Sequence, residues 1–301
     1  MKRVEHVDDL RAILDDARAS GRRVGFVPTM GYLHEGHRSL VRAARAANDV
    51  VVASIFVNPL QFAAGEDLDR YPRDLDRDAR ILEAEHTDLL FTPPVEEMYP
   101  GGAPLTTVSL PALSRGLCGG ARPTHFDGVA TVVTKLFSIV GPSRAYFGKK
   151  DFQQYVIVRR MAADLSLPVE VVGCPLVREP DGLAMSSRNA YLSPAQRQAA
   201  TVLWRGLSAG AAAVEAGERD AATLRRVVAN TITVEPTARL EYVEVVSTAD
   251  LAPVDRLDGE VLVAVAARLG ETRLIDNISV VVDGGEVTCD LGVIAESPGE
   301  R

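Results

Sequence analysis

The sequence predicts an α/β fold, a Rossmann-like doubly wound parallel sheet, followed by a second, smaller α+β domain at the C-terminus. Between residues 24 and 177, short apolar runs alternate with segments whose apolar residues have helical spacing. Strands that alternate with helices are typical of a parallel sheet with right-handed crossovers. After residue 194 the alternation stops, and two helix-like segments come before three strand-like ones. The 301 residues of the chain suffice for about two domains.

The elements of the first domain follow one another in regular order. Residues 24–27 and 50–57 are nearly continuous apolar runs, which is typical of strands covered on both faces. The segment 38–47 between them has the apolar spacing of a helix. The remaining expected elements are helices at 74–86, 128–140 and 152–165 and strands at 88–92, 145–147 and 169–172. We therefore place the first domain at residues 1–177.

Turn-forming residues separate the two domains. Pro180, Gly182 and Pro194 make residues 177–194 loop-like, and this segment is the best position for a hinge. Beyond it we expect helices at 195–217 and 221–232, strands at 240–246, 261–267 and 273–282, and a hairpin turn at 268–272. The second domain then spans residues 178–290, and residues 291–301 are expected to form a disordered tail.

The composition, with 47% apolar and 25% charged residues, is average for a globular protein. The formal net charge of −8 supplies no basic field for a nucleic-acid backbone. No stretch is long and apolar enough to span a membrane, and the N-terminus lacks the apolar core of a secretion signal. The three cysteines lie far apart, which fits neither a disulfide framework nor a zinc knuckle. We expect a reduced cytoplasmic protein that contacts neither nucleic acid nor membranes.

The most specific motif, at residues 28–37, reads Pro-Thr-Met-Gly-Tyr-Leu-His-Glu-Gly-His and joins the first strand of the sheet to a helix. His34 and His37 lie where free backbone N–H groups and the positive end of the helix dipole favour anions. Gly36 lets a phosphate approach the backbone. The motif therefore predicts a phosphate site, and the alternative is a pair of surface histidines that cap a helix. Zinc is disfavoured, since no cysteine, aspartate or third histidine lies nearby at ligand spacing.

Two of the four lysines in the chain, Lys149 and Lys150, are adjacent in the segment 147–154, Phe-Gly-Lys-Lys-Asp-Phe-Gln-Gln. This segment again joins a strand to a helix. A lysine there offers a compact point charge for triphosphate oxygens, and a solvated loop is the alternative.

Three further segments carry weaker signals. In Met-Ser-Ser-Arg-Asn, at 185–189, two hydroxyls and a guanidinium are able to bind β- and γ-phosphates, although turns and helix caps often have this sequence. Gln61, in the segment 58–62, offers a neutral amide for a small polar substrate, or is an ordinary loop glutamine. The charged stretch 66–80 is most simply a solvated helix face with i,i+4 ion pairs.

Together these motifs resemble the nucleotidyl-transfer superfamily with a His-x-Gly-His motif, which includes class I aminoacyl-tRNA synthetases. More narrowly, the chain resembles the pantothenate synthetase (pantoate–β-alanine ligase) family over residues 4–282. The segments that carry the narrower resemblance follow in the family's order at 28–37, 54–62, 71–73, 122–129, 147–154, 181–189 and 267–277.

The resemblance implies an AMP-forming ligase of pantothenate and coenzyme A biosynthesis. Such an enzyme condenses (R)-pantoate with β-alanine at the expense of ATP, through a pantoyl-adenylate and with release of pyrophosphate. The resemblance also implies Mg²⁺ as cofactor, and a homodimer whose C-terminal domain is a lid that closes over the nucleotide.

The family's functional residues carry over position by position. His37 matches the catalytic histidine, and His34 and Lys150 complete the implied catalytic set. Gln61 and Gln154 are implied to bind pantoate, and Gln61 also β-alanine. The residues implied in ATP binding are Met30, Gly31, Tyr32, Leu33, His34, Glu35, Gly36, His37, Gly148, Lys149, Lys150, Asp151, Val177, Met185, Ser186, Ser187 and Arg188. The resemblance assigns no magnesium ligand.

Two positions depart from the family pattern. Lys149 stands where the family usually has Glu, and Asp127 stands where it often has Arg. The extra cation either tightens triphosphate binding or displaces Lys150 from its contact. Neither departure replaces a residue assigned above.

Three other functions fit the residues less well. A nucleotidyltransferase that acts on a phosphate-bearing substrate shares the His-x-Gly-His chemistry but leaves Gln61 and Gln154 unexplained. A catalytically silent nucleotide-binding regulator ought to have lost a motif histidine or Lys150, and all are present. An RNA-binding role is disfavoured by the acidic net charge.

Overall fold

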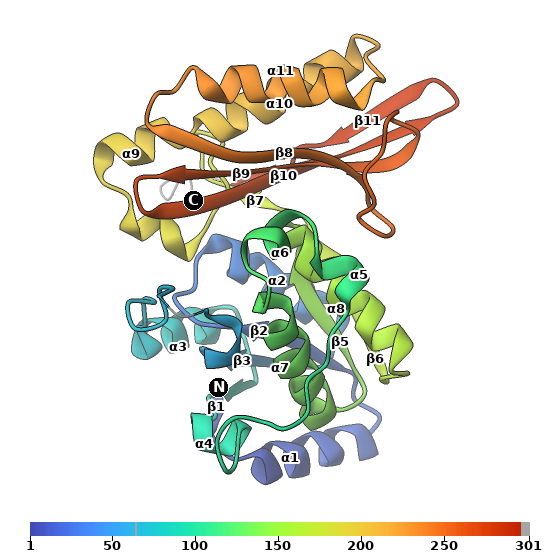
Figure 1. Cartoon of the computed structure of the whole chain (residues 1–301). Coiled ribbons are helices and arrows are strands. Elements are labelled where there is room, and N and C mark those ends of the chain that lie inside the picture. Colours follow the sequence, from blue (N-terminus) through green and yellow to red (C-terminus); the bar gives the residue numbers. More distant parts are fainter. Residues whose placement is uncertain (64, 296–301) are drawn as a thin grey trace. The chain divides into compact units, whose positions relative to one another are not determined.

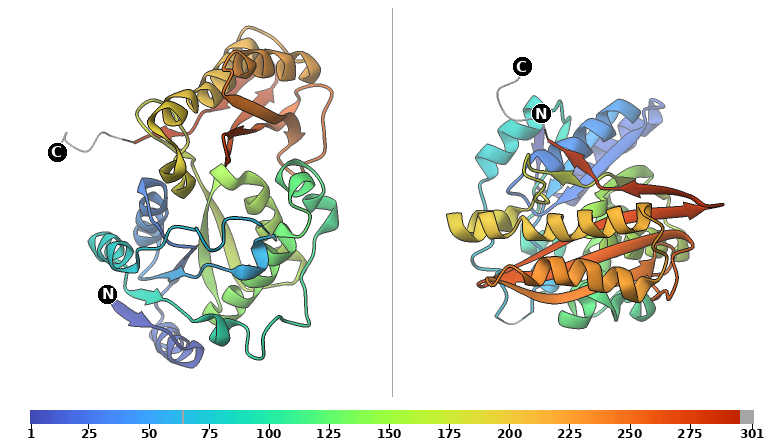
Figure 2. Two further views of the ribbon diagram at one scale, coloured as in Figure 1. Left: turned by 60° about the vertical axis from the view of Figure 1, so that its left-hand side comes forward. Right: turned by 90° about the horizontal axis from the view of Figure 1, so that it is seen from above.

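The computed structural model describes residues 1–63 and 65–295, and its contacts divide the chain into two compact units (Figures 1 and 2). The N-terminal unit comprises Met1–Arg115, Gly119–Lys149 and Ile157–Cys174. The C-terminal unit comprises Gly116–Cys118, Lys150–Val156 and the described residues from Pro175 on. The division therefore differs from a single boundary at residue 177, because two short segments group with the C-terminal unit.

The N-terminal unit contains a six-stranded parallel sheet with the strand order β1-β4-β3-β2-β5-β6, which confirms the predicted doubly wound sheet. The strands are β1 (Lys2–Val4), β2 (Val24–Thr29), β3 (Val50–Ile55), β4 (Leu89–Phe91), β5 (Ser143–Gly148) and β6 (Val169–Cys174). From the central β2 the chain moves to β3 and β4 on one side, then returns to β5 on the other. Ligands of such sheets bind beyond the carboxyl ends of the strands at this reversal, between β2 and β5.

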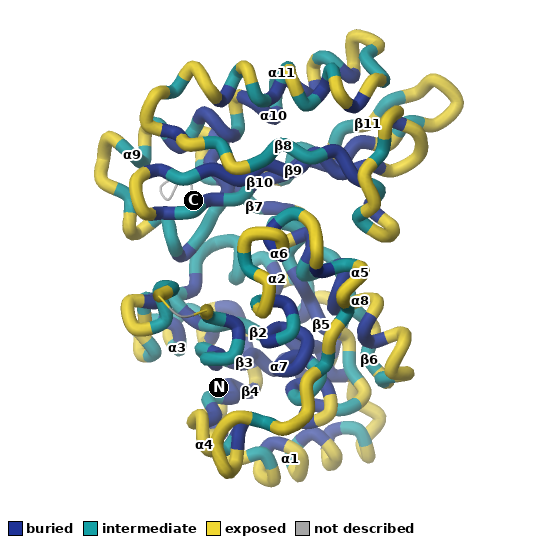
Figure 3. Tube along the Cα trace, in the orientation of Figure 1, coloured by how far each residue is buried: buried dark blue, intermediate teal, exposed yellow. Residues whose placement is uncertain are grey.

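Helices cover both faces of this sheet. Helices α1 (Val7–Ala19) and α7 (His125–Val140) pack together on one face, and α2 (Glu35–Ala47) and α3 (Leu75–Ala84) on the other. All of β3 except Ile55 is buried. Most of α7 is buried too, and this helix is largely dark blue in Figure 3. The other elements are η1 (Pro59–Gln61), α4 (Val95–Met98), α5 (Pro111–Ser114), α6 (Leu117–Ala121), η2 (Lys149–Asp151) and α8 (Phe152–Asp164).

The C-terminal unit is a smaller α+β structure, as predicted. Its antiparallel sheet has the order β11-β10-β9-β8, and α10 and α11 pack against it. The bounds are β8 (Ala238–Ser247), β9 (Gly259–Leu269), β10 (Thr272–Asp283), β11 (Glu286–Asp290), α9 (Pro194–Ala199), α10 (Val202–Glu215) and α11 (Ala221–Thr233). The short strands β7 (Val177–Arg178) and β12 (Val293–Ile294) form a separate parallel pair, and η3 (Ser187–Tyr191) follows β7.

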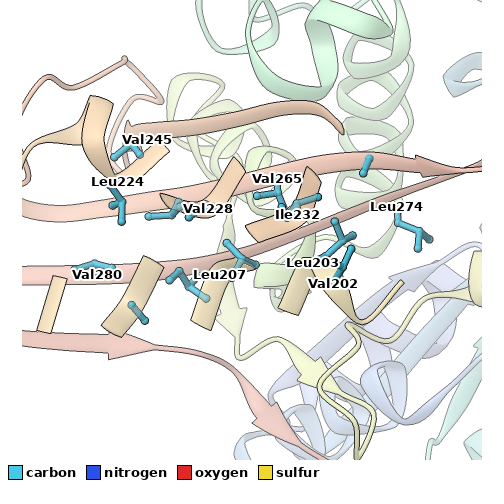
Figure 4. Packing of buried hydrophobic residues seen from close by; sticks show 14 of the residues in the cluster. Val202, Leu203, Leu207, Leu224, Val228, Ile232, Val245, Val265, Leu274 and Val280 are labelled. Carbon is cyan, nitrogen blue, oxygen red and sulfur yellow. The ribbon is translucent and has the colours of Figure 1, made fainter. Parts of the chain in front are cut away.

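Leucine and valine side chains fill the space between the two helices and this sheet, as Figure 4 shows. Two glycines let α10 and α11 approach each other closely. A Cβ on Gly206 would lie 2.6 Å from Ile232, and one on Gly210 would lie 2.7 Å from Val228. A larger residue at either position would therefore push the helices apart.

The structure corrects three expectations. Residues 195–217 form two helices, α9 and α10, because the backbone N–H groups of Thr201 and Leu203 bond to carbonyls only three residues earlier, those of Gln198 and Ala200. The expected disordered tail at 291–301 is wrong at its start, where β12 pairs with β7; residues 296–301 lie outside the described residues. The sequence analysis also missed two elements, β1 and α1, which come before the first strand that it assigned.

Across the described residues, no helix combines the length and the apolar character that crossing a bilayer requires.

Candidate functional site

The His-x-Gly-His motif forms the loop after β2 and the first turn of α2. His34 caps the helix, and its Nδ1 accepts a 3.2 Å hydrogen bond from the backbone N–H of Gly36. The Nδ1 of His37 accepts a 3.2 Å bond from the backbone N–H of His34. A ring nitrogen that accepts a hydrogen bond carries no proton, so each neutral imidazole has its proton on Nε2.

The two imidazoles thus supply Nε2–H donors beside the N-terminus of a helix. Their ring centroids lie 4.1 Å apart, and both residues are half-buried. The positive end of the α2 dipole favours an anion at the same place. This arrangement suits phosphate oxygens, which accept hydrogen bonds and carry negative charge.

A buried carboxylate, which the sequence analysis did not single out, holds the loop before His34. Asp78 of α3 is 1% exposed and accepts hydrogen bonds from the backbone N–H groups of Tyr32, at 2.6 Å, and Leu33, at 2.8 Å. Gly31 has a φ of 85°, and a Cβ there would lie 3.0 Å from Asp78 Oδ2. Both the backbone conformation and the available space therefore require glycine at this position of the motif.

The interpretation of residues 66–80 as a solvated helix face is wrong at Asp78. Helix α3 begins only at Leu75, and the Asp78 carboxylate points into the protein, toward the motif loop. Burial raises the pKa of the Asp78 carboxyl, and the two backbone N–H bonds offset part of that rise. In the sequence, Asp78 looks the same as Asp76, which is exposed on the same helix.

Asp78→Ala is expected to lower the free energy of unfolding by about 1–3 kcal/mol, because two buried N–H groups lose their acceptor. Urea titrations followed by circular dichroism measure this, with Asp76→Ala as the matched control. The amide hydrogens of Tyr32 and Leu33 should also exchange faster in the Asp78 variant. Equal stability of the two variants would contradict the role given to Asp78.

Glu35, the acidic residue within the motif, pairs with arginines of its own helix. It forms an ion pair with Arg42 and lies 3.4 Å from Arg38 Nη1. Both arginines also contact the buried carboxylate of Glu85, with Arg38 Nε at 2.6 Å from it. The arginines offset the negative charge that Glu35 would otherwise place near a phosphate.

Gln61, in η1 after β3, has its amide orientation set by neighbours. It is 8% exposed, its Oε1 accepts from Asn58 Nδ2 at 3.2 Å, and its Nε2 lies 2.8 Å from Met30 Sδ. Asn58 is itself held by the Tyr99 hydroxyl, at 2.7 Å, and by the carbonyl of Gly128, at 3.1 Å. The amide N–H groups of Gln61 therefore face the motif loop, near Met30.

The segment Arg-Pro-Thr-His holds the backbone of Gln61. Arg122 Nη2 and His125 Nδ1 both donate to the Gln61 carbonyl, at 3.2 and 2.8 Å. Glu66 accepts two bonds from the Arg122 guanidinium, at 2.7 and 2.6 Å. A Cβ on Gly128 would lie only 2.2 Å from the backbone of η1, so glycine is needed where α7 passes η1.

The two adjacent lysines of η2 fall in different units, Lys149 in the N-terminal and Lys150 in the C-terminal one. The Lys150 side chain is 18% exposed, with Nζ 3.9 Å from Asp151 Oδ2. Gln153 is buried and bonds to the backbone of residues 116 and 118, whereas the predicted pantoate ligand Gln154 is half-buried.

The Met-Ser-Ser-Arg segment begins a short 3₁₀-helix. Ser186 caps η3 by accepting a 3.2 Å bond from the backbone N–H of Arg188, and Ser187 is buried. The chain reaches η3 through a tight hairpin, in which the Met185 N–H bonds to the Val177 carbonyl at 3.0 Å. The segment is therefore ordered by its own local bonds.

Each unit gathers some of the predicted site residues. In the N-terminal unit these are Met30, Gly31, Tyr32, Leu33, His34, Glu35, Gly36, His37, Gln61, Gly148 and Lys149. In the C-terminal unit they are Lys150, Asp151, Gln154, Val177, Met185, Ser186, Ser187 and Arg188. Within the described ranges 1–63 and 65–295, no three His, Cys, Asp or Glu side chains lie close enough together to hold a metal ion.

A doubly wound sheet with paired imidazoles at a helix N-terminus, directly after its central strand, is consistent with the class of nucleotidyl-transfer enzymes that the His-x-Gly-His motif resembles. The sequence pattern of the Pantoate-beta-alanine ligase family matches residues 2–279 of the chain. The chain belongs to this family, and it is an ATP-dependent ligase that joins pantoate to β-alanine.

Individual relatives agree with the family match. The pantothenate synthetase of Heliobacterium modesticaldum is 56% identical over 282 residues, 94% of this chain and 100% of the relative. The crystal structure of pantothenate synthetase from Thermus thermophilus is 50% identical, with a TM-score of 0.87 over 92% of this chain and 98% of that one. The pantoate–β-alanine ligase from Francisella tularensis, complexed with beta-gamma ATP and β-alanine, is 32% identical, with a TM-score of 0.75 over 92% and 97%.

Proposed function

We propose that the chain makes pantothenate in two steps, each with a defined bond change. In the first, the carboxylate of (R)-pantoate attacks the α-phosphorus of ATP, and pyrophosphate leaves with the electron pair of the broken bond. In the second, the amine of β-alanine attacks the carbonyl carbon of pantoyl-adenylate. The bond from that carbon to the phosphate oxygen breaks and releases AMP, and the nitrogen loses a proton as the amide forms. The relative from Francisella tularensis, complexed with beta-gamma ATP and β-alanine, supports ATP and β-alanine as two of these substrates.

One observation carries this proposal: the Nδ1 atoms of His34 and His37 both accept hydrogen bonds from backbone N–H groups. The Nε2–H donor of each ring therefore points away from the backbone. Attack on the α-phosphorus increases the negative charge on the phosphate oxygens. Donors held in place before the reaction stabilise that charge without reorganising. We assign His37, His34 and Lys150 to this role, and the ATP-binding residues named above to holding the nucleotide.

Gln61 suits the binding of pantoate and β-alanine because its N–H groups are directed by Asn58 rather than free to rotate. An amide donor binds a carboxylate without adding a second positive charge to the pocket. We assign Gln61 to pantoate and β-alanine and Gln154 to pantoate.

Magnesium enters the proposal as part of the substrate MgATP. Mg²⁺ is usually bound through substrate phosphates, water and few carboxylates, so we expect the triphosphate to supply most of its ligands. A homodimer and a C-terminal unit that acts as a lid follow from the family resemblance. A cytoplasmic location follows from the cysteine pattern and the N-terminal sequence, and all three stay predictions.

Exchange of labelled pyrophosphate into ATP tests the first half-reaction. With magnesium and without β-alanine, exchange should occur only when pantoate is added. Exchange that does not need pantoate would contradict pantoate as the group that receives the adenylate. No exchange with pantoate present, while ATP still binds, would favour a nucleotide-binding regulator or a different acceptor.

The departure at Lys149 is expected to act on nucleotide affinity rather than on the chemical step. Lys149→Glu should raise the KM for MgATP several-fold, because it removes a positive charge near the triphosphate and adds a negative one. The kcat of the variant should stay within about threefold of that of the unmodified protein. Steady-state kinetics at two salt concentrations measure this, since screening should shrink the difference. A large fall in kcat would mean that Lys149 contacts the reacting phosphates directly.

A further inference from the structure

The segment 267–277 contributes to the family resemblance but has no role in the steps described above. Its last two residues, Asp276 and Asn277, lie on β10 and are both buried. Successive side chains of a strand point to opposite faces, so these two reach different partners. Asp276 binds the guanidinium of Arg178, whereas Asn277 reaches the segment that contains Lys150.

The main chain of Asn277 is held by the ion pair of Arg178 and Asp276. The backbone N–H of Asn277 donates to Asp276 Oδ1 at 2.7 Å, and the backbone carbonyl of Asn277 accepts from Arg178 Nη2 at 3.1 Å. From this position, Asn277 Nδ2 donates to the carbonyl oxygen of Lys150 at 2.8 Å. All four residues belong to the C-terminal unit.

We infer that Asn277 is a positioning residue for Lys150, setting the place from which the ammonium group meets the phosphates of ATP. The hydrogen bond from Asn277 fixes the main chain of Lys150. It therefore sets the position from which the lysine side chain extends and leaves the charge of the ammonium group unchanged. The inference rests on the proposed function, because it takes Lys150 to be a phosphate-binding residue.

The buried ion pair of Arg178 and Asp276 also contacts the hairpin that leads to Met185 and Ser186. Arg178 Nη1 donates to the carbonyl of Gly182 at 3.0 Å, within that hairpin. Two segments with predicted phosphate-binding residues are thus tied to Arg178 and Asp276, one of them through Asn277. Asn277 is the member of this group whose side chain bonds to the main chain of Lys150.

Asn277→Ala is expected to lower kcat for pantoate-dependent pyrophosphate exchange by about 10–100-fold, since a small misplacement of a catalytic group has effects of that size. The KM for pantoate should not change. Ser279→Ala, at another buried polar position of β10, is the matched control and should retain the rate of the unmodified protein.

A double-mutant cycle separates positioning from general damage. If Asn277 acts through Lys150, then Asn277→Ala should have less than about a twofold effect in a Lys150→Ala background. An undiminished effect in that background would overturn the inference.

Hydrogen exchange of peptides covering residues 147–156 tests the contact without relying on activity. Exchange there should be faster in Asn277→Ala than in Ser279→Ala, and unchanged exchange would overturn the inference. Faster exchange with an unchanged rate of catalysis would also overturn the inference, because Lys150 would act equally well without the bond from Asn277. The proposed function fails on a different result, the absence of pantoate-dependent pyrophosphate exchange in the unmodified protein. The two failures are therefore distinguishable.

Discussion

Replacing His37 or Lys150 with alanine is expected to slow pantoyl-adenylate formation about 10²–10³-fold in each variant. Both side chains are assigned to the oxygens that gain charge as pantoate attacks ATP. Removing such a donor affects the transition state more than the ground state, so kcat should fall more than the KM for MgATP rises. Single-turnover formation of the adenylate, followed by quenching, measures the step directly.

Controls separate this loss from damage to the fold. His37→Ala also removes the acceptor for the His34 N–H, which is expected to cost about 1 kcal/mol of stability. His86→Asn and Lys2→Ala change exposed residues of the same types and should retain activity. Near-native adenylate formation in both His37→Ala and Lys150→Ala would show that neither side chain meets the reacting phosphate.

The sheet and the position of the His-x-Gly-His motif at the start of a helix were predictable because their signals are local. The apolar runs of β2 and β3 and the helical spacing after His37 lie in the sequence in the order in which the elements form. A histidine pair directly after such a strand indicates an anion site from the geometry of helix ends alone. For the strands that the sequence analysis assigned to this sheet, the observed bounds differ from the expected ones only at their ends.

The residues that support the site were not predictable, because their roles depend on contacts between distant parts of the chain. Asp78 and Leu33 are 45 positions apart, and Asn277 and Lys150 are 127 apart. Helical periodicity places Asp78 on a charged stretch, and only the packing of α3 against the motif loop shows its carboxylate to be buried. Strand alternation likewise does not reveal which neighbour Asn277 contacts.

Breaking the ion pair of Arg178 and Asp276 is expected to cause the largest loss of stability among the predictions, about 3–5 kcal/mol for Asp276→Ala. Arg178 is fully buried, and its five N–H donors all have acceptors. Burial raises the pKa of the Asp276 carboxyl, and the Arg178 guanidinium opposes that rise. Without Asp276, a buried cation would lose its counter-charge.

The single tryptophan of the chain reports on this region. The Arg178 guanidinium carbon lies 4.2 Å from the centre of the Trp204 ring. Urea titrations followed by Trp204 emission should therefore show an earlier transition in Asp276→Ala. Arg197→Ala removes partly exposed ion pairs with Asp181 and Glu179, whose side chains are 47% and 28% exposed, and should cost about 1 kcal/mol.

Salt and a double variant distinguish a buried ion pair from simple loss of packing. The loss of stability in Asp276→Ala should persist at roughly 1 M salt, because salt screens exposed ion pairs much more than buried ones. Arg178→Met combined with Asp276→Leu should recover part of the stability, because replacing both charges removes the unpaired cation. Recovery stays incomplete, since the carbonyls of Gly182, Leu291 and Asn277 still lose their donor. If Asp276→Ala were no less stable than Arg197→Ala, the C-terminal unit would not depend on this pair, and Asn277 would need another support.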